Sequence, residues 1–134
     1  ISFSAEATRE IGVLQNAVSE ILDITYAALI NNDLKLAAEV EPLEEVIDEL
    51  RDQIKLNHIL RLQKSECTIE HGFVLSDLLN NFERVSDHCS NIAGCVVEIS
   101  SHEALDMHKY LSQMKYGSEE FNEKYAGYRS KYSL

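Results

Sequence analysis

The sequence predicts an all-α protein: an antiparallel three-helix bundle followed by two short C-terminal helices. The 134-residue chain contains one Pro and five Gly, a composition that suits helices. Apolar residues recur at steps of three and four over long stretches, which is typical of helices packed in a bundle. No segment shows the apolar–polar alternation of a half-buried strand. We therefore expect a bundle over residues 1–100 and a C-terminal extension over residues 101–134, which packs on the bundle or on a second copy.

The first two helices are expected from about residue 4 to 30 and from Asp33 to about residue 62. Asn31-Asn32-Asp33 is a turn, in which Asp33 has the side chain of an N-cap. Pro42 lies inside the second segment, so either the helix kinks there or a turn precedes a helix that begins at Pro42. The predicted apolar seams are Ile11, Leu14, Val18, Ile21, Thr25 and Ala28 in the first helix, and Leu36, Val40, Leu43, Ile47, Leu50 and Ile54 in the second.

The third helix shows the strictest pattern in the chain. Residues 63–67 interrupt the periodicity, and Thr68 is expected to cap a helix that extends to about residue 99. Its apolar residues alternate steps of three and four without interruption, which is a heptad seam. The residues of this seam are Leu75, Leu78, Phe82, Val85, Cys89, Ile92, Val96 and Ile99.

Two shorter helices are expected after residue 99. Ser100 and Glu103 have the spacing of a capping box, which predicts a helix that ends at Gly117. Ser118 begins the last helix. Its aromatic stripe consists of Phe121, Tyr125, Tyr128 and Tyr132.

The charge balance excludes some partners. The chain has 12 Lys and Arg against 23 Asp and Glu, a net charge of −11. Such a surface repels nucleic acid and anionic lipid and favours cations or basic proteins. We see no apolar run that approaches the roughly 20 residues of a membrane span, so we expect no direct membrane insertion by this segment. Three cysteines cannot all pair with one another, and reduced thiols indicate a cytoplasmic location.

Oxygen-bearing side chains recur every four residues on two of the expected helices. Glu83, Asp87 and Asn91 lie along one strip of the third helix, on the outer face away from its seam. Glu44 and Asp48 have the same spacing on the second helix. The ordinary interpretation is a solvated helix face. Alternatively, the two pairs meet at a groove and hold Fe, Mn, Zn or Mg through carboxylate oxygens.

The motifs of common enzymes are missing, so we do not expect an enzyme. The sequence has no Gly-rich phosphate loop, no Gly-x-Ser-x-Gly elbow and no Cys-x-x-Cys. Cys89 and His88 are adjacent on a helix and point about 100° apart, so they do not form a dyad. Cys67 lies in a loop, with no activating base evident nearby in the sequence.

The run Asn81-Phe82-Glu83-Arg84-Val85-Ser86-Asp87-His88-Cys89-Ser90-Asn91-Ile92-Ala93 resembles the third-helix signature of PhoU, a phosphate-transport regulator. The stretch Glu44 to Leu50 is similar to the second-helix counterpart, which places residues 4–99 on one PhoU-type repeat. The segments His58 to Leu62 and Glu66-Cys67-Thr68, with the tail, resemble more closely the cytosolic C-terminal domain of bacterial sodium/phosphate-cotransporter proteins.

This resemblance implies a regulatory domain for phosphate uptake that binds a multinuclear Fe or Zn cluster. The implied metal ligands are Glu44, Asp48, Glu83, Asp87 and Asn91. The implied partners are the membrane transporter portion of the same chain, or a transport or signalling protein. The sequence opens without Met, so it is expected to belong to a longer, membrane-tethered protein. A homodimer is also expected. The alternative function is a metal-free helical dimerisation or interaction module.

Overall fold

The computed structural model describes residues 3–101 and 119–134. These residues form four helices: α1 (Ala5–Asn31), α2 (Leu34–Gln63), α3 (Ile69–Ser101) and α5 (Glu119–Lys131). No strand occurs in the described ranges, so the predicted all-α class is confirmed. Ser100 belongs to α3 and does not begin a new helix. The helix expected from there to Gly117 otherwise lies outside the described residues.

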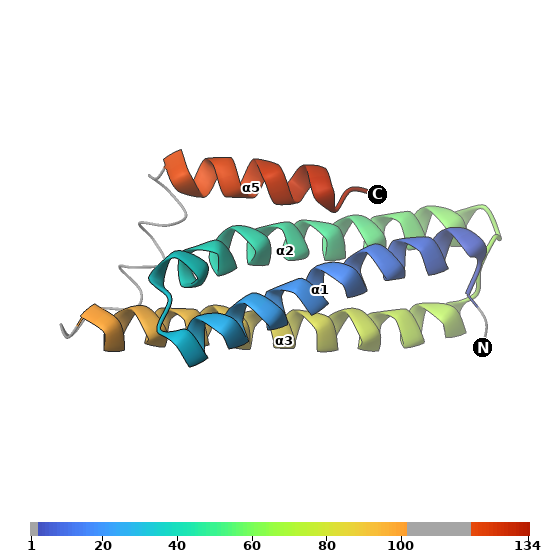
Figure 1. The fold of residues 1–134 in the computed structure, drawn as a ribbon. Helices are drawn as coiled ribbons and strands as arrows, with labels where there is room; N and C mark the ends of the chain where they lie inside the picture. Colours follow the sequence, from blue (N-terminus) through green and yellow to red (C-terminus); the bar gives the residue numbers. More distant parts are fainter. Residues whose placement is uncertain (1–2, 102–118) are drawn as a thin grey trace.

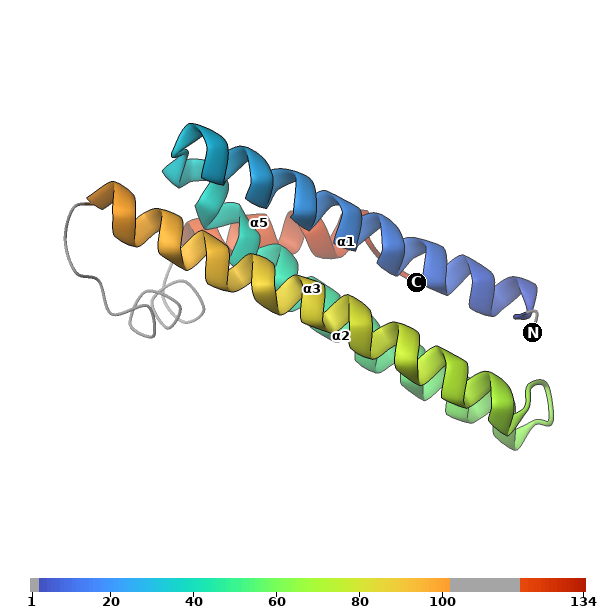
Figure 2. The ribbon, with the colours of Figure 1, turned by 90° about the horizontal axis from the view of Figure 1, so that it is seen from below.

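Three long helices lie side by side and α5 covers one of them. Figure 1 shows α1, α2 and α3 along one another, with successive helices running in opposite directions. Each of these three helices contacts the other two, and α5 packs on α2. Figure 2 shows the molecule from below, with α5 behind the three long helices. As a result α2 is covered from three sides over residues 36–50, where only Glu49 is exposed.

Short turns with specific caps set the ends of the helices. Asn32 adopts the left-handed conformation (φ 49°) that ends α1, a conformation that Asn tolerates well. Asp33 Oδ1 accepts hydrogen bonds from the backbone N–H groups of Lys35 and Leu36, at 3.0 and 3.2 Å. Thr68 Oγ1 accepts from a backbone N–H in the first turn of α3, at 3.3 Å. Both predicted N-caps are therefore confirmed.

The cores of α1 and α2 follow the predicted seams. Leu14, Ile21, Leu43 and Ile47 are almost completely buried. α2 continues through Pro42 from Leu34 to Gln63, so the alternative of a turn that ends before Pro42 is wrong. The buried apolar residues of these two helices are Ala7, Leu14, Ala17, Val18, Ile21 and Ala28 in α1, and Ala37, Val40, Leu43, Val46, Ile47, Leu50 and Ile54 in α2.

The heptad seam predicted for α3 is correct only in part. Leu75, Cys89 and Val96 are buried, but Ile92 is 38% exposed and Ile99 is 63% exposed. The buried face lies one residue beyond part of the predicted seam: Leu79, Ser86 and Ala93 are buried, and each directly follows a seam residue that is less buried. Steps of three and four do not determine which of two adjacent positions faces the other helices. The positions that α3 buries in addition are Leu79, Ser86, Ser90 and Ala93.

α5 is held on the bundle by aromatic and polar contacts. Phe121 and Tyr132 are buried. Lys124 Nζ lies 2.6 Å from Glu39 Oε1 of α2, and Lys131 Nζ lies 2.7 Å from Glu20 Oε1 of α1. The aromatic stripe of the last helix thus contacts the bundle of its own chain.

α1 is long and apolar enough, by length and composition, to cross a membrane. The helix has 27 residues, and the mean hydropathy of its most apolar window is 1.2. About one third of that window is buried inside the structure. The expectation that no segment approaches a span is wrong for this helix, because scattered charges interrupt the run without lowering its mean hydropathy enough. Core helices of water-soluble bundles pass the same test, so composition alone is weak support for a membrane helix.

Candidate metal centre

Two polar contacts join α2 to α3 along their shared interface. Ser90 Oγ donates a hydrogen bond of 2.6 Å to Glu41 Oε2, and both side chains are buried. About three turns further along α2, Arg51 forms an ion pair with Glu83. This contact raises the pKa of Arg51 above its ordinary value. Both contacts are attractive, and they fix which turns of α2 and α3 face each other.

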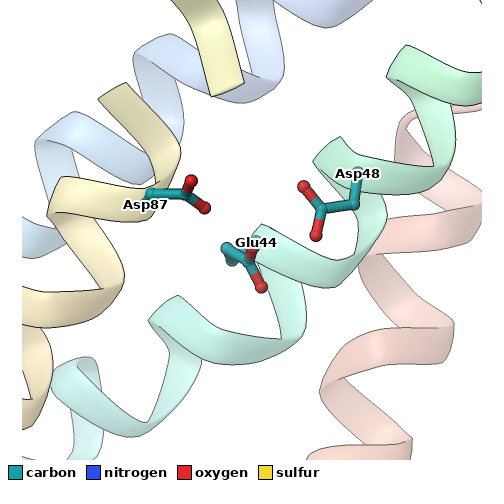
Figure 3. A group of neighbouring side chains, drawn as sticks. All are labelled: Glu44, Asp48 and Asp87. Atoms are coloured by element: carbon teal, nitrogen blue, oxygen red, sulfur yellow. The ribbon is translucent and has the colours of Figure 1, made fainter. Parts of the chain in front are cut away.

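Three carboxylates converge between these two contacts. One oxygen each from Glu44, Asp48 and Asp87 lies within 4.8 Å of the other two. Figure 3 shows Glu44 and Asp48 reaching from successive turns of α2 toward Asp87 on α3. Glu44 is 5% exposed, Asp48 is half-buried and Asp87 is exposed. The group is thus buried at its base and open to solvent on the α3 side. We call Glu44, Asp48 and Asp87 the carboxylate cluster.

The electrostatics of the carboxylate cluster centre on Asp48. Burial raises the pKa of Asp48 above its ordinary value, and the charges of Asp87 and Glu45 act in the same direction. A hydrogen bond with Glu44 and the charge of Arg51 oppose this rise. Oδ1 of Asp48 is buried and has no hydrogen-bond partner among the described residues. A buried acceptor of this kind is costly unless a proton or a cation satisfies it.

The structure brings together three of the five residues named as ligands. Glu83 pairs with Arg51 and is not one of the carboxylates that converge. Asn91 is exposed, one turn beyond Asp87. Glu44 does not lie on an outer face, since it is buried in the part of α2 that the other helices cover.

Sequence analysis overlooked Arg51. It follows Asp48 by three residues and Glu44 by seven, so all three share one face of α2. That spacing is the signal that could have identified Arg51 as the partner of an acidic residue on the neighbouring helix.

The donor set of the carboxylate cluster fits a cation. Three carboxylate oxygens from two helices suit Mn²⁺, Mg²⁺ or Fe²⁺, and Zn²⁺ also accepts such ligands. The described surroundings supply no nitrogen or sulfur ligand to the cluster. A cation would relieve the mutual repulsion of the three groups and would satisfy Asp48 Oδ1.

Comparison with known proteins gives two matches. The model of the PhoU domain family matches residues 11–96. The chain is 24% identical over 114 residues to "Phosphate-specific transport system accessory protein PhoU homolog 1" of Thermotoga maritima. The aligned region covers 85% of this chain and 48% of that protein, so the chain spans about half the length of the curated relative it matches. No solved structure matches the chain.

Proposed function

The chain belongs to the PhoU domain family, and from this membership we propose that it is a non-enzymatic regulatory domain of phosphate uptake. It acts through protein contacts and a metal ion on the carboxylate cluster. The match over residues 11–96 and the name of the Thermotoga maritima relative support the link to phosphate transport. In this proposal the domain is cytoplasmic and regulates a sodium/phosphate cotransporter, whose membrane portion belongs to the same chain and tethers it to the inner membrane.

The observation that carries the metal proposal is the geometry of the carboxylate cluster. Asp87 comes from α3 and faces Glu44 and Asp48 of α2, at distances within 4.8 Å. Like charges do not gather in this way without a cost: burial first, and then the charges of Asp87 and Glu45, raise the pKa of Asp48. A divalent cation bound there offsets the repulsion and links the two helices. Fe and Zn are the metals proposed, and Mn serves as a further probe of an all-oxygen site.

The test is metal-dependent stabilisation of the purified chain. Melting temperatures are measured by circular dichroism with and without Fe²⁺, Zn²⁺ and Mn²⁺. We expect at least one metal to raise the melting temperature of the natural sequence, because an ion that binds only the folded state stabilises it. The double variant Asp48→Asn, Asp87→Asn should lose this gain.

The matched control is Asp77→Asn. Asp77 is exposed on α3, so this variant also removes a carboxylate from the same helix but leaves the cluster intact. It should keep the full metal-dependent gain. Glu83→Gln separates the ion pair with Arg51 from a ligand role, since only a ligand role for Glu83 predicts a smaller gain. An unchanged melting temperature of the natural sequence with all three metals would overturn the metal proposal.

A second candidate function, a dimerisation module, is supported by an apolar stripe on α1. The stripe consists of four exposed residues on one face of the helix: Leu22, Tyr26, Leu29 and Ile30. Their spacings of four, three and one residues place them on that shared face. The proposed occupant is a second copy of the chain, since a symmetric pair would cover the same apolar stripe on both copies. Sedimentation should then show a dimer that Tyr26→Lys and Leu29→Lys dissociate, while circular dichroism shows that each variant keeps its helical content. A strict monomer at high concentration would reject this function.

A further inference from the structure

A small hollow lies where the loop between α2 and α3 meets the beginning of α1. Its volume is about 230 Å³, and Cys67, His58 and Arg61 contribute to its lining. Cys67 is partly buried, and its Sγ lies 3.5 Å from Nδ1 of His58. The thiol also lies 3.6 Å from the backbone oxygen of His58, which is a second acceptor for its proton. The hollow thus places a thiol beside a side chain that can take its proton.

The imidazole of His58 is held in place by the neighbouring helix. A Cβ atom added to Gly72 of α3 would lie 2.9 Å from His58 Nε2, so the ring occupies space that only a glycine leaves open. Burial lowers the pKa of His58 below its ordinary value, and the nearby Arg61 and His71 act in the same direction. His58 is therefore neutral at pH 7 and has a ring nitrogen available to accept a proton.

Arg61 lines the same hollow and has an unpaired hydrogen-bond donor. The residue is 8% exposed, and its Nη1 binds Glu10 Oε1 at 2.8 Å. Its Nη2 is buried and has no hydrogen-bond partner among the described residues. An unsatisfied guanidinium donor is matched by an oxygen of a bound molecule, and it stabilises negative charge on that oxygen.

We propose that Cys67 is a nucleophilic thiol and that the hollow is a site of oxidation by small hydroperoxides. His58 takes the thiol proton, and the thiolate sulfur attacks one peroxide oxygen. A sulfur–oxygen bond forms and the oxygen–oxygen bond breaks, so sulfur is oxidised to a sulfenic acid and the peroxide is reduced. The departing oxygen receives the proton from His58 and leaves as water or an alcohol. Arg61 Nη2 donates to the reacting oxygen. The modification occurs once per chain and is independent of the carboxylate cluster.

The other two cysteines provide internal controls. Cys89 is buried, and its burial raises its pKa, so it should react slowly. Cys95 is exposed on α3 and should react as an ordinary accessible thiol. Selectivity for Cys67 over Cys95 therefore measures activation rather than access alone, since Cys95 is the more exposed of the two.

The experiment treats the purified chain with dilute hydrogen peroxide at pH 7 and traps sulfenic acid with a dimedone probe. Mass spectrometry of peptides gives the rate at each cysteine. We expect Cys67 to react at least about ten-fold faster than Cys95, because a positioned base commonly contributes a factor of 10² or more. His58→Gln should reduce the rate at Cys67 to about that of Cys95. Equal rates at Cys67 and Cys95 in the natural sequence, or an unchanged rate at Cys67 in His58→Gln, would overturn the proposal.

Two further variants test the roles of the surrounding groups. Gly72→Ala forces the His58 ring to move and should slow Cys67 several-fold. Arg61→Lys keeps the ion pair with Glu10 but removes the second guanidinium nitrogen, and it should slow oxidation by peroxide more than alkylation by iodoacetamide, which delivers no oxygen. An unchanged rate at Cys95 and an unchanged melting temperature show that each variant is folded. If both variants oxidise at the natural rate, the hollow plays no part in the reactivity of Cys67 and the proposal fails.

Discussion

The ion pair between Glu10 and Arg61 should be the most sensitive polar contact in the bundle. Glu10 is 1% exposed, although it lies on α1 among apolar neighbours. Arg61 of α2 binds one of its oxygens at 2.8 Å, and Asn57 of α2 donates to the other. The perturbation is Arg61→Met, which keeps most of the side-chain volume and removes the charge.

The expected loss follows from the burial of the carboxylate left behind. Removing one partner of a buried pair leaves an uncompensated charge and typically costs about 3–5 kcal/mol. Adding Glu10→Gln removes that charge and retains a group that Asn57 can bind. The double variant should therefore recover more than half of the loss. As the control, Arg9→Met breaks an exposed pair with Glu6 and an exposed hydrogen bond to the Leu134 backbone oxygen, and it should cost less than about 1 kcal/mol.

Urea unfolding followed by circular dichroism measures these differences. For an m-value of about 2 kcal/mol/M, Arg61→Met should lower the midpoint by about 2 M, and the control variant should shift it by less than about 0.5 M. A double variant that is as unstable as Arg61→Met would refute the reasoning. That result would mean that the cost comes from lost packing of the Arg61 side chain and not from the buried charge of Glu10.

Three further predictions concern the core, the carboxylate cluster and α5. In urea unfolding, Leu79→Ala should lower the free energy of unfolding by about 2–5 kcal/mol and Ile92→Ala by less than about 1 kcal/mol, because Leu79 is buried and Ile92 is not. Equal losses would contradict the observed core. Burial raises the pKa of Asp48, so the folded state holds this proton more tightly than the unfolded state, and the site loses stability as pH rises from the ordinary carboxylate range near 4. Asp48→Asn should therefore raise the metal-free melting temperature at pH 7 and not at pH 3. An equal gain at both pH values would contradict a raised pKa of Asp48 in the folded state. Phe121→Ala should speed hydrogen exchange in residues 119–131 while α1 keeps its protection, and uniform loss of protection would show that α5 unfolds only with the bundle.

The sequence was sufficient to predict the elements whose signals are local. Asp33 and Thr68 cap their helices because a side-chain oxygen reaches N–H groups two or three residues away, whatever the rest of the fold. The seams of α1 and α2 were predictable because their apolar residues already follow the helical period. The strict heptad of α3 misled at Ile92, because the apolar spacing does not show that the adjacent Ala93, and not Ile92, faces the other helices.

The contacts that sequence analysis missed depend on how separate helices face each other. Glu44 and Asp87 could be expected to approach because their helices are neighbours. That Glu83 pairs with Arg51 depends on the longitudinal offset of α2 and α3, which no local pattern determines. In the same way, Cys67 meets His58 only because the chain reverses between them, so no base could be seen beside the thiol in the sequence.

The contacts on either side of the carboxylate cluster have a consequence for how it would respond to an ion. Two contacts, Ser90 with Glu41 and Arg51 with Glu83, hold α2 and α3 together on either side of the cluster. They oppose any sliding or separation of these helices that would relieve the repulsion among the three carboxylates. The favourable interactions of folding therefore already offset the repulsion of the three carboxylates before any ion binds. A cation that binds there has little left to reorganise, so its affinity reflects mainly the direct attraction. Such an ion would stiffen this part of the bundle and damp the relative motion of α2 and α3, with little change in their average positions.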